Sequence, residues 1–199
     1  MRDVKCEANA GPPGESGCGC ECRSNRPGTP PSPGTGDAHG DGRILNVELL
    51  AIDLDSCRRC VPTSAQMKRA LHLLQPVADA LGVELRHREI VVRTSEQARE
   101  TAFATSPTIR LNGRDIAQDI YESECESCGD LARNGTGVDC REWHYRGQVH
   151  PSVPLPLLVE AITDAMLRID ELPPVTPGRL EELPENLERF FANKTCITR

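Results

Sequence analysis

Hydrophobic and polar positions follow regular patterns in one central part of the chain, residues 44–169. Residues 44–54 are a nearly continuous apolar run, which predicts a mostly buried β-strand. Residues 62–81 place apolar side chains at i, i+3, i+4 and i+7 spacing. This spacing predicts an amphipathic helix, which Pro76 should kink or interrupt. Residues 83–92 alternate and then close on aliphatic residues, which predicts a second strand.

A second helix and a third strand are expected next. Thr94 and Gln97 have the spacing of a capping box, so a helix should begin after Thr94 and run to about Phe103. Residues 104–111 then lead into a strand.

The dipeptide Asn112-Gly113 predicts a tight hairpin turn, because both residue types tolerate positive φ. The return strand should cover Arg114 to about Ile120. Residues 121–150 show neither helical nor strand periodicity, so the sequence does not fix the conformation of this Cys-rich insertion. Residues 155–169 carry one apolar face and predict the last core helix.

The two ends of the chain differ from its centre. Residues 1–43 contain nine glycines and six prolines and few large apolar side chains, so we expect a disordered tail. Phe190 and Phe191 should dock a short C-terminal helix on the domain, because two exposed phenylalanines would be unfavourable. The expected organisation is a tail at 1–43, a domain at 44–172 with an insertion at 121–150, and an extension at 173–199.

Composition and charge narrow the class of protein. Hydrophobic residues are 38% of the 199 and aromatic residues only 3%, so the core must be aliphatic. The formal net charge of -7 argues against nonspecific nucleic-acid binding, which needs a basic surface. No run reaches the roughly 20 apolar residues of a membrane span, and the first 43 residues lack an apolar secretion core. We therefore expect a cytoplasmic protein without nucleic-acid or membrane partners, whose thiols stay mostly reduced.

A Cys-x-x-Cys pair, Cys57 and Cys60, lies between the first predicted strand and the first predicted helix. Backbone N–H groups and the helix dipole stabilise a thiolate at such a helix start, and Arg58 and Arg59 add positive charge. This spacing beside a βαβ-like pattern indicates a redox motif. The alternatives are half of a zinc site and two unrelated buried thiols.

A second group of cysteines lies in the insertion. Cys125, Cys128 and Cys140 are followed by His144, and these four side chains would complete a tetrahedral zinc site. The spacing equally allows redox or relay cysteines, or unrelated thiols. Five more cysteines lie near the chain ends: Cys6, Cys18, Cys20, Cys22 and Cys196. The three at alternate positions in the tail, Cys18, Cys20 and Cys22, could wrap a soft cation or be inert.

The order strand, Cys-x-x-Cys helix, strand, helix, Ser-Pro strand, hairpin strand and helix resembles the thioredoxin fold. The resemblance rests on Cys57 and Cys60 after the first strand and on Ser106-Pro107 opening the third, and it covers about residues 44–169. It implies an α/β fold with a mixed four-stranded sheet flanked by helices and a Cys-rich insertion before the last core helix. It also implies that Pro107 is cis and lies against the Cys-x-x-Cys pair.

Within that superfamily, the segments TSPT at 105–108 and ECESC at 124–128 resemble an uncharacterised prokaryotic thioredoxin-like family, a domain of unknown function. This resemblance brings no established activity. Thioredoxins have Trp before the first cysteine and Gly-Pro between the two, whereas this chain has Ser56 and Arg58-Arg59. The Pro-Tyr of glutaredoxins is also absent, so the motif supports neither a general disulfide reductase nor glutathione use.

Strand direction in the resembled fold places the insertion. The third strand runs antiparallel to the first, so its start at Pro107 lies at the Cys57 end, and the fourth strand returns to that side. The insertion should then emerge beside Cys57 and Cys60, and five cysteines could converge on one surface. Such convergence favours either a disulfide relay or a thiolate-rich metal cup over a remote structural metal site.

Two hypotheses of function follow. The first is a thiol–disulfide oxidoreductase acting on protein thiols or disulfides, with Cys57 as attacking thiolate, Cys60 as resolving thiol and Pro107 holding the partner chain. The second is a binding or trafficking protein for a thiophilic metal or metalloid such as zinc, mercury or arsenite. Whether the protein is an enzyme stays open at this point, as do the physiological partner and the redox potential.

Overall fold

The computed structural model describes residues 43–117, 119–128 and 138–195, which belong to one unit of the chain, His39–Arg199. Among the described residues, no helix is long and apolar enough to cross a membrane. The expected tail at 1–43 lies outside the described residues except for Arg43. The cysteines near the chain ends also lie outside them: Cys6, Cys18, Cys20, Cys22 and Cys196.

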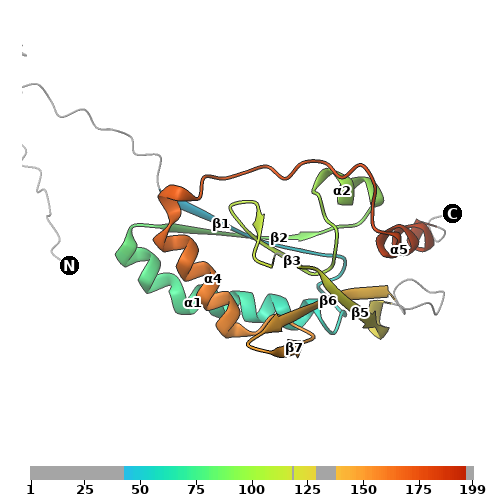
Figure 1. Ribbon diagram of the computed structural model, residues 1–199, viewed down its shortest axis with the longest axis horizontal. Helices are drawn as coiled ribbons and strands as arrows, with labels where there is room; N and C mark the ends of the chain where they lie inside the picture. The colour runs from blue at the N-terminus through green and yellow to red at the C-terminus, as the bar shows by residue number, and fades with distance from the viewer. Residues whose placement is uncertain (1–42, 118, 129–137, 196–199) are drawn as a thin grey trace, which may run out of the picture. The chain divides into compact units, whose positions relative to one another are not determined.

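A mixed sheet lies at the centre of the described fold. It consists of β1 (Ile44–Ala51), β2 (Glu84–Val91), β3 (Thr108–Leu111) and β4 (Arg114–Asp115). The strand order is β2-β1-β3-β4, in which β1 and β2 are parallel and the other two pairs are antiparallel (Figure 1). The expected fold class, a mixed four-stranded sheet with flanking helices and a Cys-rich insertion before the last core helix, is confirmed.

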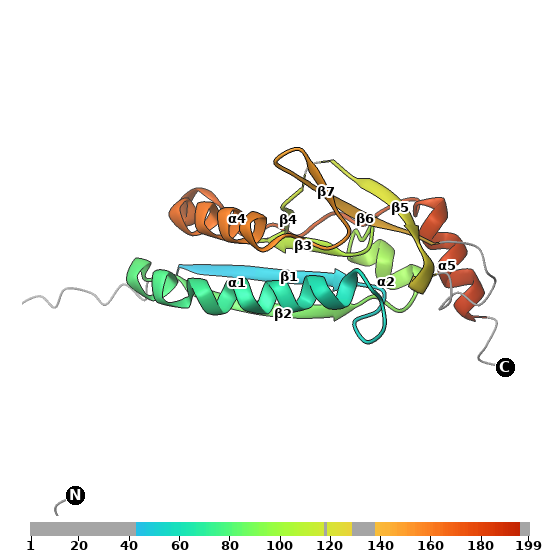
Figure 2. The same ribbon diagram turned by 90° about the horizontal axis from the view of Figure 1, so that it is seen from below.

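Two helices, α1 (Cys60–Leu81) and α4 (Leu155–Leu167), lie along the same face of this sheet (Figure 2). Of the expected kink or interruption at Pro76, the interruption is wrong, because α1 runs through Pro76 without a break. The helix ends at Gly82 with φ 65°. The apolar faces of both helices pack on β1 and form the first hydrophobic core, which includes Leu45, Val47, Leu49, Met67, Leu74, Leu158, Ile162 and Met166.

A second hydrophobic core lies beyond the carboxyl end of β1. The helices α2 (Ser95–Glu100) and α5 (Glu185–Thr195) border it, and α5 packs against α2. Phe190 and Phe191 are 1% and 2% exposed, so the expected docking of the C-terminal helix is confirmed. Other members of this core are Leu50, Ile52, Val92, Phe103, Leu187 and the described cysteines.

The start of α2 agrees with the capping pattern, whereas its end does not reach the expected position. The Gln97 backbone N–H donates to Thr94 Oγ1 at 3.1 Å, and Gln97 Oε1 accepts from the Arg93 backbone N–H at 2.8 Å. The helix stops before Phe103 because Ala102 adopts a φ of 51°, which turns the chain. The Phe103 side chain thereby enters the second core.

The predicted hairpin turn is present, with φ of 48° at Asn112 and 82° at Gly113. The return strand β4 covers only two residues instead of the expected seven at 114–120. The Asn112 side chain accepts from the Asn46 backbone N–H at 2.9 Å and donates to the Leu172 carbonyl at 2.7 Å. The turn is therefore fixed to both the sheet and the segment that follows α4.

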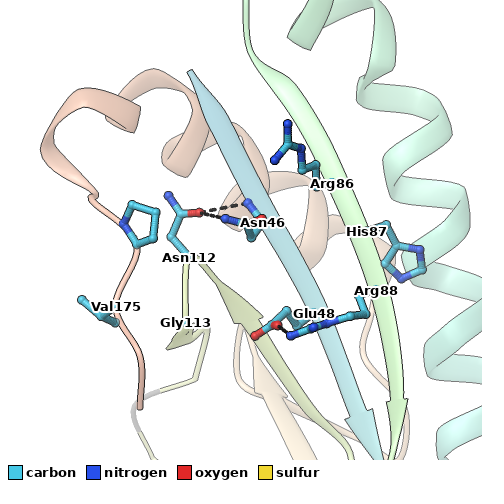
Figure 3. A pocket seen from close by; sticks show the side chains of 9 residues that line it. Asn46, Glu48, Arg86, His87, Arg88, Asn112, Gly113 and Val175 are labelled. Atoms are coloured by element: carbon cyan, nitrogen blue, oxygen red, sulfur yellow. Dashed lines mark hydrogen bonds and ion pairs between the residues drawn. The ribbon is translucent and has the colours of Figure 1, made fainter. Parts of the chain in front are cut away.

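That segment borders a polar groove on the sheet. The groove has a volume of about 400 Å³ and is shown in Figure 3. Its lining includes Asn46, Glu48, Arg86, Arg88 and Val175. The two arginines pair with carboxylates, Arg86 with Glu84 and Arg88 with Glu48, so these charges are balanced locally.

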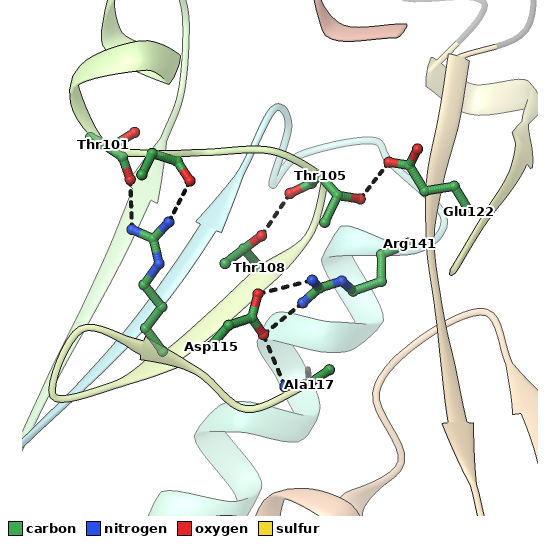
Figure 4. A network of polar contacts seen from close by, with 9 residues as sticks. Thr101, Thr105, Thr108, Asp115, Ala117, Glu122 and Arg141 are labelled. Atoms are coloured by element: carbon green, nitrogen blue, oxygen red, sulfur yellow. Dashed lines mark hydrogen bonds and ion pairs between the residues drawn. The ribbon is translucent and has the colours of Figure 1, made fainter. Parts of the chain in front are cut away.

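The insertion contains a second sheet, for which the sequence at 121–150 shows no strand periodicity. It consists of β5 (Tyr121–Cys125), β6 (Val138–Tyr145) and β7 (Gln148–His150), all antiparallel. The periodicity was hidden because β6 buries a charged residue, Arg141, directly after buried Cys140, which breaks the alternation of apolar and polar positions. Its guanidinium is 0% exposed and pairs with Asp115 through two 2.9 Å hydrogen bonds (Figure 4).

Candidate functional site

The loop between β1 and α1 carries the Cys-x-x-Cys pair. Asp53 shapes this loop, because its carboxylate accepts hydrogen bonds from the backbone N–H groups of Asp55 and Ser56 at 2.6 and 2.9 Å. The chain then turns inward at Cys57, and α1 begins at Cys60, two residues before the predicted helix start. The Cys60 backbone N–H points at Cys57 Sγ at 3.3 Å, as expected for a sulfur at a helix start.

Four sulfurs gather at this point. The Sγ atoms of Cys57, Cys125, Cys128 and Cys140 all lie within 4.8 Å of one another. Cys57 Sγ is 3.5 Å from Cys128 Sγ, which in turn is 3.2 Å from Cys140 Sγ. All four are free thiols, and none is more than 4% exposed. The expectation that the insertion cysteines converge on the Cys-x-x-Cys pair is confirmed.

These sulfurs come from separate elements. Cys125 ends β5, Cys128 lies in a helical segment whose described residues are 126–128, and Cys140 lies on β6 opposite Ser123. Cys125 and Cys140 share the second hydrophobic core with Cys57, which follows the carboxyl end of β1. We call Cys57, Cys125, Cys128 and Cys140 the four-sulfur cluster.

His144, the fourth ligand of the zinc site expected from sequence, does not join the four-sulfur cluster. It lies four residues beyond Cys140 on β6, about 13 Å along an extended strand. Its ring is stacked on Tyr121, with centroids 3.9 Å apart. The structure instead brings Cys57 beside the three insertion cysteines.

Cys60 is buried next to the four-sulfur cluster but is not a member of it. Its Sγ is 3.4 Å from Ser106 Oγ, and that hydroxyl also accepts from the Ile52 backbone N–H at 3.2 Å. Pro107 follows directly, is buried, and is joined to Ser106 by a cis peptide bond. The loop that opens β3 therefore lies against the second cysteine of the pair.

Arg59 connects the Cys-x-x-Cys loop to the insertion. Its guanidinium donates to the carbonyls of Cys140 and Glu124, both at 2.8 Å, and to Ser123 Oγ at 2.7 Å. Arg58 differs, since its side chain is exposed and lies 3.9 Å from Glu126. Sequence reasoning had assigned both arginines to thiolate activation and missed that Arg59 joins the two parts of the site.

A second set of polar contacts supports β6 (Figure 4). The Arg141 backbone N–H donates to the Ser106 carbonyl at 2.7 Å, and its side chain pairs with Asp115. Thr105 Oγ1 donates to Glu122 on β5 at 2.5 Å. The insertion is thus fixed to the loop before β3 at the same place where Cys60 meets Ser106.

The thiols of the cluster shift one another's pKa through hydrogen bonds. Hydrogen bonds from Cys125, and then from Cys128, Cys140 and Cys60, hold the pKa of Cys57 well below its usual range. Hydrogen bonds with Cys128 and Cys140 lower the pKa of Cys125 to about 7. Hydrogen bonding to Cys125 raises the pKa of both Cys128 and Cys140.

Such a cluster could hold a metal ion or act in redox chemistry. Four buried thiols cannot all ionise beside one another, because like charges in a low-dielectric site repel strongly. A cation that replaces the shared protons would remove this conflict, since metal ligands must be deprotonated.

The chain was compared with known proteins. It matches the family described as "Domain of unknown function (DUF2703)" over residues 45–162, a span that contains all five described cysteines. No curated protein and no solved structure matches the chain. The match shows an uncharacterised domain family, and the chain belongs to the DUF2703 domain family.

Proposed function

We propose that this domain binds a thiophilic metal ion, with zinc as the best candidate, through the four-sulfur cluster on a thioredoxin-like fold. The observation that carries the proposal is the meeting of four buried, free sulfurs within 4.8 Å. The sheet order, the Cys-x-x-Cys pair at the start of α1 and Ser106-Pro107 before β3 support the thioredoxin likeness.

The geometry of the cluster suits a tetrahedral ion. Four sulfurs at the Zn–S distance of about 2.3 Å lie roughly 3.8 Å from one another. The sulfur pairs at 3.2, 3.5 and up to 4.8 Å bracket this value. Four protein ligands without an open position are typical of a site that retains its ion rather than one that activates water.

The burial of Cys57 favours metal binding over disulfide exchange with proteins. An attacking thiolate must reach the sulfur of its substrate, and Cys57 is 0% exposed. Thiol–disulfide oxidoreduction remains the second candidate function because the Cys60 N–H and thiol lie beside Cys57 at a helix start. In that case Cys57 is the nucleophile, Cys60 resolves, and Pro107 holds the partner.

The test uses the full chain in which Cys6, Cys18, Cys20, Cys22 and Cys196 are all changed to serine, here called the five-serine protein. We expect one tightly bound zinc per chain after purification without added metal, measured by elemental analysis. Each of the single changes Cys57→Ser, Cys125→Ser, Cys128→Ser and Cys140→Ser should lower zinc affinity. His144→Ala and Cys60→Ser are matched controls that should retain the ion.

A contrary result is equally clear. If the five-serine protein carries no metal after incubation with zinc under reducing conditions and all its thiols react in a thiol count, metal binding is wrong. A reversible Cys57–Cys60 disulfide in that metal-free protein would then support the oxidoreductase.

A further inference from the structure

Cys57 has sulfur neighbours of two kinds. It is a member of the four-sulfur cluster, and it is also the partner of Cys60, whose sulfur lies outside that cluster. We propose that Cys60 is a redox-active thiol that discharges the metal: oxidation joins Cys57 to Cys60 in a disulfide and removes one of the four ligands. This inference rests on the proposed metal site.

Cys60 is placed for this reaction by two contacts. Its backbone N–H donates to Cys57 Sγ at 3.3 Å. On its other side, the Cys60 sulfur meets Ser106 Oγ at 3.4 Å. Cys125, Cys128 and Cys140 would be held by the ion, so Cys60 is the neighbouring thiol that stays available.

The burial of the pair selects a small oxidant. Cys57 and Cys60 are both 0% exposed, which disfavours a bulky disulfide and suits hydrogen peroxide or a small organic hydroperoxide. Cysteine thiolates are oxidised by such peroxides to sulfenic acids, which condense with a second thiol.

The step balances as follows. The Cys57 thiolate attacks one peroxide oxygen, the O–O bond breaks, hydroxide leaves, and Cys57 carries a sulfenic acid. Cys60 Sγ then attacks the Cys57 sulfur, the S–O bond breaks, and the S–S bond forms. The departing oxygen takes the Cys60 thiol proton and leaves as water. Two electrons pass from the two sulfurs to the peroxide.

Loss of Cys57 as an anionic ligand leaves three thiolates around the ion. The ion then keeps Cys125, Cys128 and Cys140, all from the insertion, and loses its only ligand from the β1–α1 loop. Since the thiolate is the form that binds metal, a disulfide sulfur cannot replace it. The ion should leave when the bridge forms and be taken up again after reduction.

The experiment compares the five-serine protein with the same protein carrying Cys60→Ser. Both are loaded with zinc, treated with hydrogen peroxide, and followed with a chromophoric zinc indicator. We expect the five-serine protein to release zinc in step with peroxide consumed, and peptide mapping to show a Cys57–Cys60 bridge. The Cys60→Ser protein should keep its zinc at the same dose and time.

The outcomes separate this inference from the proposed function. If the reduced five-serine protein binds no zinc, both are wrong. If it binds zinc but releases it equally fast with Cys60→Ser, or if mapping shows Cys57–Cys128 or Cys125–Cys128 bridges instead, only this inference is overturned. Should Cys60→Ser fail to fold, the mapped bridge in the five-serine protein decides the question alone.

Discussion

At the scale of single residues, Arg59 connects the two parts of the candidate site. Cys57 lies in the β1–α1 loop, whereas the other three cysteines of the cluster lie in the insertion. Arg59 bridges the two parts through the carbonyls of Glu124 and Cys140 and the hydroxyl of Ser123. Such supporting contacts orient ligands without touching the ion.

We therefore predict that Arg59→Ala weakens zinc binding by about 10–100-fold, the usual effect of losing a partner that orients metal ligands. Arg59→Lys should restore little, because an ammonium group lacks the planar fork that reaches three acceptors. Competition with a chromophoric chelator measures the affinity. Arg58→Ala is the matched control, since the Arg58 side chain is exposed and 3.9 Å from Glu126. Equal affinities for Arg59→Ala and Arg58→Ala would contradict this role.

Whole elements were predictable where one apolar pattern decides their structure. The strand at 44–54 and the helix at 62–81 appear as β1 and α1, with ends shifted by a few residues. The insertion strands were not predictable, because buried Arg141 is neutralised by Asp115 from a distant part of the chain. No local pattern reveals that pair.

The candidate site was predictable to a similar extent. The strand directions of the resembled fold placed the insertion beside the Cys-x-x-Cys pair, and the structure confirms that position. The exclusion of His144 from the four-sulfur cluster depends on the β5–β6 sheet, in which His144 stacks on Tyr121. That sheet was hidden by its polar sequence, so the contacts of Arg59 with the insertion could not be predicted from the sequence.

The β3–β4 turn allows a sharp test of the fold. A Cβ atom on Gly113 would lie 2.0 Å from the Val175 carbonyl oxygen, and φ is 82°. Gly113→Ala should therefore lower the free energy of unfolding by well over the 1–2 kcal/mol or so that a left-handed conformation alone costs. Gly147→Ala is the matched control, because φ is 75° there and nothing lies within 4 Å. Denaturant unfolding measures the free energy of unfolding of both variants. Equal decreases would contradict the prediction and show that the segment at Val175 moves to make room for the added Cβ.

In the described molecule as a whole, the two hydrophobic cores differ in their cysteine content. The first core, between the sheet and helices α1 and α4, contains no cysteine among the described residues. The second contains all five described cysteines together with Phe190 and Phe191 of α5. Asn186 on α5 also exchanges hydrogen bonds with the backbone of Asp139, directly before Cys140. An ion in the cluster would thus stabilise the second core in particular.

This difference predicts a localised response to metal removal. Ligand at 100 times its Kd stabilises a folded protein by about 2.7 kcal/mol, so a chelator should lower the Tm of the reduced five-serine protein. Hydrogen exchange should accelerate in β5, β6 and α5, while the amides of Leu45, Val47 and Leu49 in β1 keep their protection, because their core does not include the sulfurs. The same chelator should change neither Tm nor exchange in Cys57→Ser. Uniform acceleration across both cores would contradict the prediction and show that the ion stabilises the described fold as one cooperative unit.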